Sequence, residues 1–164
     1  MKFLTDKPIV FLEDLKAIII ADLHIGLEYE FYKSGIIVPS QAKKFEKEIK
    51  EVISFTNAEK LIILGDVKHN IPTFNWREEK SIPAFLSAIS KEVTIDIVLG
   101  NHDGKLKQLV KGIGNINVHS AKGFRERNYG FFHGHAWPKK ELFFCKYLFM
   151  GHIHPSIEIR CSLG

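Results

Sequence analysis

Five short hydrophobic runs in this sequence are each followed at once by polar residues. Lys16–Ala21, Leu61–Leu64 and Val93–Leu99 are continuous and rich in β-branched residues, so we expect strands that are buried on both faces. Tyr129–Phe132 and a part of Leu142–Met150 predict two later strands. The pattern therefore indicates a sheet that is covered on each side.

Helical spacing fills the intervals between the first three runs. Within Pro39–Thr56, apolar residues recur at the period of an α-helix, which predicts an amphipathic helix. A shorter helix is expected over residues 81–90, with Ser81 as its cap. Residues 1–15 form a mixed lead-in to which no single element is assigned, and residues 71–80 are expected to be a loop.

Strands that alternate with helices predict an α/β fold with a largely parallel first half. The later half is rich in strands joined by short connections, which favours antiparallel pairing. Ser156–Cys161 alternates between apolar and polar residues and predicts a half-exposed strand. At 164 residues the chain is long enough for a substantial core, so we expect a single domain over residues 1–164.

Composition narrows the class of protein without naming an activity. The hydrophobic fraction of 45% and the charged fraction of 26% are typical of a soluble globular protein. No apolar run approaches the ~20 residues that span a bilayer, and residues 1–10 lack the apolar core of a signal peptide. Cys145 and Cys161 show no CxxC spacing, so reduced thiols and a cytoplasmic location are expected. The net charge of +4 is a mild bias toward an anionic partner.

Ligand-type side chains follow all five runs. They are Asp22 and His24; Asp66; Asn101, His102 and Asp103; His133 and His135; and His152 and His154. In α/β sheets the loops beyond the carboxyl ends of the strands converge, so these residues are expected to meet. Each motif alone has a plain structural explanation, such as a capped turn or a buried core histidine. Their recurrence behind five strands favours a binding site.

The residue types indicate which ligand such a site would take. Carboxylate, amide and imidazole groups form a mixed oxygen and nitrogen set, which suits Mn²⁺, Fe²⁺ or Zn²⁺ better than Mg²⁺ or Ca²⁺. The set is too large for one ion, whereas two ions ~3.5–4 Å apart that share a carboxylate would use it. The sequence therefore predicts a dinuclear metal centre.

The ordered motifs resemble those of the calcineurin-like metallophosphoesterases. The resemblance covers residues 16 to about 155 and rests on Asp22-x-His24, Gly65-Asp66, Gly100-Asn101-His102-Asp103, His133-Gly134 and Gly151-His152-x-His154. In detail these motifs look most like the compact ICC-like branch, whose bacterial members are associated with DNA ligase and helicase genes. The resemblance implies mixed β-sheets sandwiched by helices, in the four-layer order αββα.

The resemblance also implies a role for each residue. Asp22, His24 and His154 would bind the first metal ion, Asp66 would bridge both ions, and Asn101, His133 and His152 would complete the second site. His102 would lie just outside the metal ligands, where it can stabilise the transition state or protonate the leaving oxygen. Asp103 would orient His102. The implied cofactors are two divalent ions, with Mn²⁺ favoured over Fe²⁺, Zn²⁺ or Ni²⁺.

These roles imply hydrolysis of a phosphomonoester or phosphodiester by attack of a metal-bridging hydroxide, with nucleotides or nucleic-acid ends as expected substrates. Two alternatives stay open: a non-catalytic interaction scaffold, and a nuclease component of a DNA-repair assembly. His69 follows the bridging position closely and could either line the substrate pocket or hydrogen-bond a metal ligand. His135 is not expected to bind metal.

Proteins of the resembled family usually continue after the Gly-His-x-His motif with strands that complete the second sheet. Here ten residues follow His154, so the C-terminal part of the fold is expected to be incomplete. An open sheet edge at Ser156–Cys161 would favour a homodimer.

Overall fold

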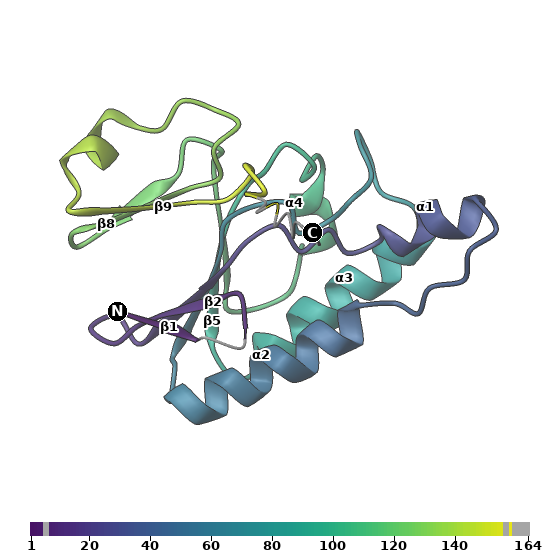
Figure 1. Cartoon of the computed structure of the whole chain (residues 1–164), viewed down its shortest axis with the longest axis horizontal. Coiled ribbons are helices and arrows are strands. Elements are labelled where there is room, and N and C mark those ends of the chain that lie inside the picture. The colour runs from purple at the N-terminus through teal and green to yellow at the C-terminus, as the bar shows by residue number, and fades with distance from the viewer. Residues whose placement is uncertain (5–6, 156–157, 159–164) are drawn as a thin grey trace, which may run out of the picture.

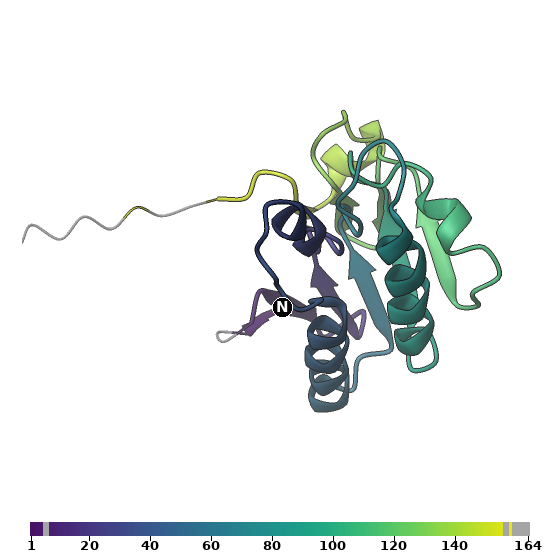
Figure 2. The ribbon, with the colours of Figure 1, turned by 90° about the vertical axis from the view of Figure 1, so that its right-hand side faces the viewer.

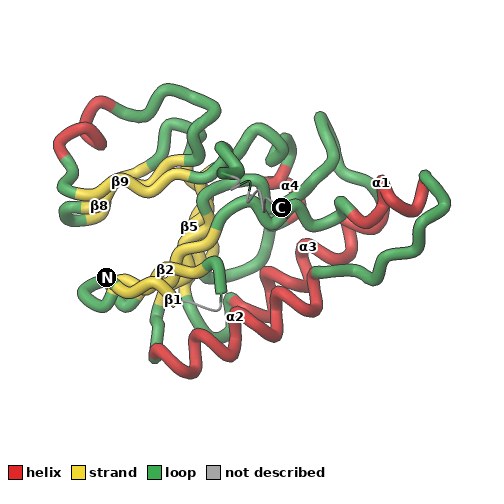
Figure 3. Tube along the Cα trace, viewed as in Figure 1, coloured by secondary structure: helices red, strands yellow, loops and turns green. Residues whose placement is uncertain are grey.

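A computed structural model describes residues 1–4, 7–155 and 158 of the chain and shows two β-sheets with helices packed on the larger one (Figure 1). In Figure 3 the strands of the larger sheet lie between the long helices and the smaller sheet. The α/β class expected from the sequence is confirmed. The strand predicted at Ser156–Cys161 lies outside the described residues, apart from residue 158.

The larger sheet has six strands, which lie side by side in sequence order. They are β1 (Lys2–Leu4), β2 (Ile9–Leu12), β3 (Ala17–Ile20), β4 (Lys60–Ile63), β5 (Thr94–Val98) and β6 (Ile116–His119). Strands β3 to β6 are parallel, as predicted, whereas β1 and β2 pair in antiparallel fashion beside β3. The mixed lead-in over residues 1–15, to which the sequence assigned no element, therefore contains two strands. These strands are short, and they form because β2 pairs with β3 and β1 pairs with β2.

The smaller sheet contains β7 (Phe124–Glu126), β8 (Tyr129–Phe132) and β9 (Tyr147–Met150). Strands β7 and β8 form the expected antiparallel pair, but β8 and β9 are parallel. The connection between them is not a tight turn, because it carries the 3₁₀ helix η1 (Lys140–Phe144) across the sheet, as a parallel pair requires. The prediction of antiparallel pairing throughout the later half was therefore wrong.

Four α-helices connect the strands: α1 (Glu28–Lys33), α2 (Ala42–Thr56), α3 (Trp76–Ile89) and α4 (Leu106–Leu109). Figure 2 shows α2 and α3 side by side against the larger sheet. Their apolar residues, such as Ile53 and Phe85, share one core cluster with Ile18 and Ile63 of the sheet. No helix within the described residues is long and apolar enough to cross a membrane.

Helix α3 begins earlier than the sequence pattern suggested. Its cap is Asn75, whose Oδ1 accepts hydrogen bonds of 2.9 Å from the backbone N–H groups of Arg77 and Glu78. Glu78 in turn accepts a bond of 2.8 Å from the Asn75 N–H, which completes a capping box. Ser81, expected to be the cap, lies inside the helix, because these reciprocal bonds fix the helix start at Trp76.

A second core cluster joins the two sheets. Ile19 and Leu64, on or next to the larger sheet, pack with Phe124 and Phe131 of the smaller one, and Phe149 packs against this cluster. On the outer side of the smaller sheet, a side chain at Gly130 would meet Leu142, which places η1 over that face. The described chain therefore follows the expected order of helices, sheet, sheet and helix, with a single short η1 in its last layer.

Candidate metal centre

The carboxyl ends of β3, β4, β5, β8 and β9 meet at one edge of the fold, as predicted from the sequence. Three groups of side chains there each place one ligand atom per residue within 4.8 Å of the others. The groups are Asp22, His24 and His154; Asp66, His133 and His152; and His24, His69 and His102. The first two correspond to the two metal sites inferred from sequence, and the third adds His69.

Asp22 connects the end of β3 to the loop that follows β9. Its Oδ1 lies 3.7 Å from Nε2 of His154, and its Oδ2 accepts a hydrogen bond of 3.0 Å from the backbone N–H of His152. The carboxylate thus holds the second sheet's last loop against the first sheet. The structure brings together the three residues expected at the first metal ion.

Asp66 lies between the first two groups. Its Oδ2 is 3.2 Å from Nε2 of His133 and 3.7 Å from Nε2 of His24. Nε2 of His133 also lies 3.1 Å from Oδ1 of Asn101. Nδ1 of His133 donates to the carbonyl of Leu64 at 2.6 Å, so Nε2 is the nitrogen that faces the centre. This is the arrangement that a bridging carboxylate requires.

These distances fit metal ligation. Two cis ligands of one first-row ion, each ~2.1 Å from it, are ~3 Å apart. The separations of 3.2 Å and 3.1 Å around Nε2 of His133 match that spacing. Nδ1 of His24 is moreover buried without a hydrogen-bond partner in the described part of the chain. The oxygen and nitrogen donors present therefore fit divalent ions of the kind expected.

The backbone is bent to deliver these side chains. Asp22, His24, Asp66, His152 and His154 all adopt positive φ, between 44° and 71°. Such conformations are uncommon for residues other than glycine, and they concentrate at functional sites. Each of the five is an expected metal ligand, so this backbone strain is concentrated in the loops that form the centre.

Two glycines lie so close to expected ligands that a side chain at either position would overlap them. A Cβ atom on Gly65, which has φ of +84°, would lie 2.6 Å from Cγ of His133. A Cβ on Gly100 would lie 2.8 Å from Cγ of Asp66. Both glycines follow predicted strands directly, so their place in the sequence motifs has a steric reason.

The electrostatics of the site favour an ionised Asp66. Burial alone would raise the pKa of Asp66, but hydrogen bonds from His133 and from the His102 N–H outweigh it and lower that pKa to about 2. Burial lowers the pKa of His24, which keeps its imidazole neutral and available as a ligand.

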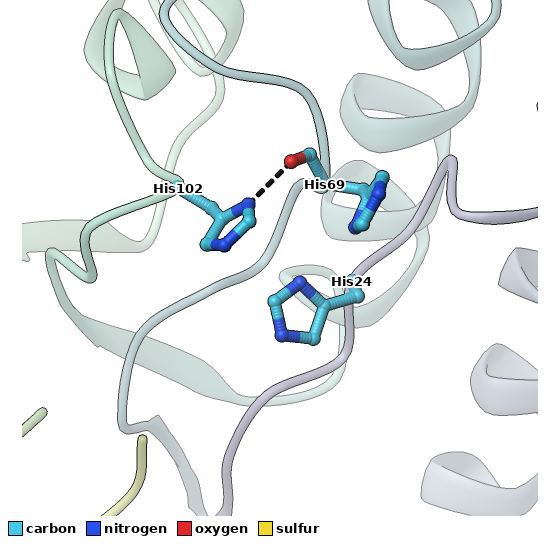
Figure 4. A group of neighbouring side chains, drawn as sticks. All are labelled: His24, His69 and His102. Atoms are coloured by element: carbon cyan, nitrogen blue, oxygen red, sulfur yellow. Dashed lines mark hydrogen bonds between the residues drawn. The ribbon is translucent and has the colours of Figure 1, made fainter. Parts of the chain in front are cut away.

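The contacts of His102 differ from those expected. Nδ1 of His102 donates a hydrogen bond to the backbone carbonyl of His69, drawn as the dashed line in Figure 4. We expected Asp103 to orient this imidazole, but its carboxylate accepts backbone N–H bonds from Gly100 and Val67, both of 2.9 Å. Asp103 therefore fixes the loops after β4 and β5 and is not bonded to the ring of His102. Its burial raises its pKa.

Residues outside the motifs also shape the site. The ring of His69 lies near those of His24 and His102 (Figure 4), with its centroid 5.5 Å from each of theirs. Lys68 and Glu78 are fully buried beside it, whereas the sequence favoured a surface loop for Lys68 and indicated no role for Glu78. The pattern Asn75-x-x-Glu78 was a usable sign, since it is a capping box. His135, not expected to be a ligand, lies 5.2 Å from His133 between ring centroids.

An open cleft of about 540 Å³ adjoins the centre on the side of Asn101. Its lining includes Asn101, Lys105, Lys107, Gln108 and His135. Two lysines beside the ligand loops give the entrance a positive character, which suits an anionic molecule.

Comparison with known proteins agrees with this arrangement. The chain matches the model of the family described as calcineurin-like phosphoesterase over residues 15–156. No curated protein matches the chain. The match to the family model covers all of the ligand-type residues described above.

One solved structure shares the fold, and a second was also compared. The crystal structure of Pseudomonas putida nuclease MPE is 19% identical, with a TM-score of 0.59 over 90% of this chain and 66% of that one. Yfce, a phosphoesterase from E. coli, is 20% identical, with a TM-score of 0.44 over 73% of this chain and 57% of its own. The chain thus spans less than two thirds of the length of either protein.

Proposed function

Because this chain belongs to the calcineurin-like phosphoesterase family, as its match over residues 15–156 shows, we propose that it hydrolyses phosphoesters with two divalent metal ions. The main support for this proposal is the position of Asp66. Its Oδ2 lies 3.2 Å from Nε2 of His133 and 3.7 Å from Nε2 of His24. A carboxylate shared by two groups of ligands is the central requirement of a dinuclear centre. An interaction scaffold would not require such a shared contact.

Each residue has a place in the proposed reaction. Asp22, His24 and His154 would hold one ion, Asn101, His133 and His152 the other, and Asp66 both. When bound, the ions activate water and offset charge on the phosphate. His102 would donate a proton to the leaving oxygen, because its Nδ1 bond to His69 directs Nε2 away from that carbonyl. Asp103 would hold the loops that carry Asp66 and His102.

The cleft beside Asn101 supports an anionic substrate. Lys105 and Lys107 line it next to the ligand loops, so a nucleotide or a nucleic-acid end would find positive charge beyond the scissile phosphate. A nuclease from Pseudomonas putida has a similar fold, and we therefore include nucleic-acid ends among the proposed substrates. Mn²⁺ is the proposed metal, because the mixed oxygen and nitrogen ligands suit it.

The remaining proposals concern assembly and location. The described residues place no strand beyond β9, so a second copy could pair with that edge and form a homodimer. Light scattering at high concentration would test this, and a strict monomer would contradict it. We propose a cytoplasmic location, since Cys145 is a free thiol, as is usual in a reducing compartment.

The activity is tested with the protein stripped of metal and then supplied with Mn²⁺ and a chromogenic phosphodiester or phosphomonoester. Hydrolysis should appear only with metal, and Asp66→Ala should abolish it. Glu79→Ala, a change on the solvent-exposed side of α3, should leave the rate unchanged. Full activity without metal, or in Asp66→Ala, would refute the proposal.

A further inference from the structure

The peptide group between His69 and Asn70 lies between a buried carboxylate and the imidazole of His102. Its N–H donates to Oε1 of Glu78 at 2.8 Å, and its carbonyl accepts the bond from Nδ1 of His102. We propose that Glu78 is a positioning residue for His102, acting through this peptide. The inference rests on the role of His102 in the proposed function, but the contacts that support it do not.

Both carboxylate oxygens of Glu78 accept hydrogen bonds from the backbone of the loop between β4 and α3. Its side chain is 0% exposed. Oε1 accepts from the N–H of His69 at 2.9 Å as well as from Asn70, and Oε2 accepts from the N–H of Asn75 at 2.8 Å. Hydrogen bonds to an ionised carboxylate are about twice as strong as neutral ones. A helix cap alone would need only the contact with Asn75.

The geometry of a peptide group links the two ends of this chain of contacts. The 69–70 peptide is trans, so its N–H and C=O point in opposite directions within one plane. A carboxylate that binds the N–H fixes the plane and polarises the carbonyl toward the proton on Nδ1 of His102. Glu78 and His102 thus form a carboxylate–histidine pair with one peptide inserted between them, the contact that Asp103 was expected to make.

Other buried charges hold the same loop in place. Nζ of Lys68, whose side chain is fully buried, donates to the carbonyls of Asn70 and Thr73. The carboxylate of Asp103 binds the N–H groups of Val67 and Lys68. Three charged side chains therefore determine the course of a segment with no regular secondary structure, and Glu78 is the one that contacts the 69–70 peptide.

Glycine at position 26 makes room for this carboxylate. A Cβ atom on Gly26 would lie 2.6 Å from Cγ of Glu78, and Gly26 has φ of +105°. Gly26 comes two residues after His24, so the loop after β3 is shaped to admit Glu78. The contact brings the loops after β3, β4 and β5 into one connected arrangement.

The consequence for His102 is a fixed tautomer. A carbonyl can only accept, so the bond to His69 requires the proton on Nδ1 and leaves Nε2 as the nitrogen that can serve the reaction. Without the carboxylate, the 69–70 peptide can rotate, and His102 would populate both tautomers. The rotation would also move the ring away from its place beside His24 (Figure 4).

The tautomer can be measured without metal or substrate. Nitrogen-15 spectra of metal-free protein with labelled histidine, assigned with His102→Ala, should show His102 protonated on Nδ1 in the wild type. Glu78→Gln should shift a substantial fraction of His102 to the other tautomer. Asn75→Ala is the matched control, because it removes the cap side chain of the same helix and leaves the 69–70 peptide bonded. A role of Glu78 as helix cap alone predicts the same spectrum for both variants.

A second readout uses the Mn²⁺-loaded protein and two phosphodiesters. Diphenyl phosphate has a leaving group that needs a proton, whereas bis(p-nitrophenyl) phosphate does not. Glu78→Gln should lower kcat about tenfold on the first and less than about twofold on the second, with KM little changed. In a His102→Ala background the same substitution should have no further effect, because the two residues act in series.

The outcomes separate this inference from the proposed function. Wild-type His102 protonated on Nε2, or a tautomer ratio that Glu78→Gln leaves unchanged, would overturn the inference while phosphoesterase activity persisted. Should Glu78→Gln fail to fold, the wild-type spectrum alone still decides which nitrogen carries the proton. Absence of any phosphoesterase activity would instead refute the proposed function and leave the tautomer result standing.

Discussion

Nε2 of His133 lies 3.2 Å from Oδ2 of Asp66, although the two residues belong to different sheets. Asp66 follows β4 and His133 follows β8, and their side chains are 2% and 0% exposed. Buried polar groups of this kind are stable only with well-placed partners. The candidate centre is therefore formed at the junction of the sheets, and its geometry depends on how they pack.

The packing between the sheets should control stability. Phe131 is fully buried between them, with its ring centroid 5.6 Å from that of Phe149. Phe131→Ala should lower the free energy of unfolding by about 3–5 kcal/mol, because it leaves a cavity at this junction. Phe144→Ala, at a ring that is 80% exposed, should change it by less than about 0.5 kcal/mol. Chemical denaturation compares the two, and equal effects would contradict the account.

Gly100 should tolerate no side chain. The Cβ of Gly100→Ala would overlap the backbone and carboxylate of Asp66, so we expect a loss of about 2–4 kcal/mol of stability and of most metal binding. Gly114→Ala is the matched control, since a Cβ there meets nothing within 4 Å. Calorimetric titration with Mn²⁺ measures the binding. Wild-type affinity in Gly100→Ala would show that this contact does not matter.

Metal-free protein should lose stability in acid through Asp66. Its pKa falls from an ordinary 3.8 to about 2 in the folded state. The unfolded chain therefore binds more protons between these values, so this contribution to stability is complete above about pH 5 and declines as the pH falls toward 2. The expected decline is about 2 kcal/mol. Denaturation midpoints can be measured in the presence of a chelator at each pH in this window. In Asp66→Asn the midpoint should depend less on pH than in the wild type, and an unchanged dependence would contradict the lowered pKa of Asp66.

His102 should act on the reaction and not on the metals. His102→Ala should lower kcat about 100-fold on a substrate with a poor leaving group while metal content stays at the wild-type level. His119→Gln changes a histidine that is paired with Asp96 at 2.7 Å and belongs to none of the three groups of candidate ligands, so it should keep wild-type activity. Steady-state kinetics with metal analysis of the same samples tests this. Loss of metal in His102→Ala would make the residue a ligand instead.

Sequence patterns were most informative where the structure depends on local composition. The apolar runs before Asp22, Asp66 and Asn101 became β3, β4 and β5, and the convergence of their carboxyl ends follows from parallel pairing. The positions of the expected ligands could be anticipated for this reason. Their individual roles came from the family resemblance and stay predictions, while the distances around Asp66 show that the side chains lie close together.

Strand pairing between distant segments, and side-chain bonds to the backbone of loops, could not be predicted from local sequence patterns. The parallel pairing of β8 with β9 depends on a crossover, which local patterns do not encode. The bonds of Asp103 to Gly100 and Val67 go to backbone N–H groups, whose positions a sequence does not reveal. The contact of Glu78 with the 69–70 peptide is of the same kind, although the capping box at Asn75 was visible.

Electron paramagnetic resonance of Mn²⁺-loaded protein would show whether Asp66 joins two metal ions. Together with elemental analysis, the wild type should show two ions per chain and the signal of an exchange-coupled pair, because bridged ions lie ~3.5–4 Å apart. Asp66→Asn should lose that coupling. A single ion per chain, or two uncoupled ions in the wild type, would contradict the account.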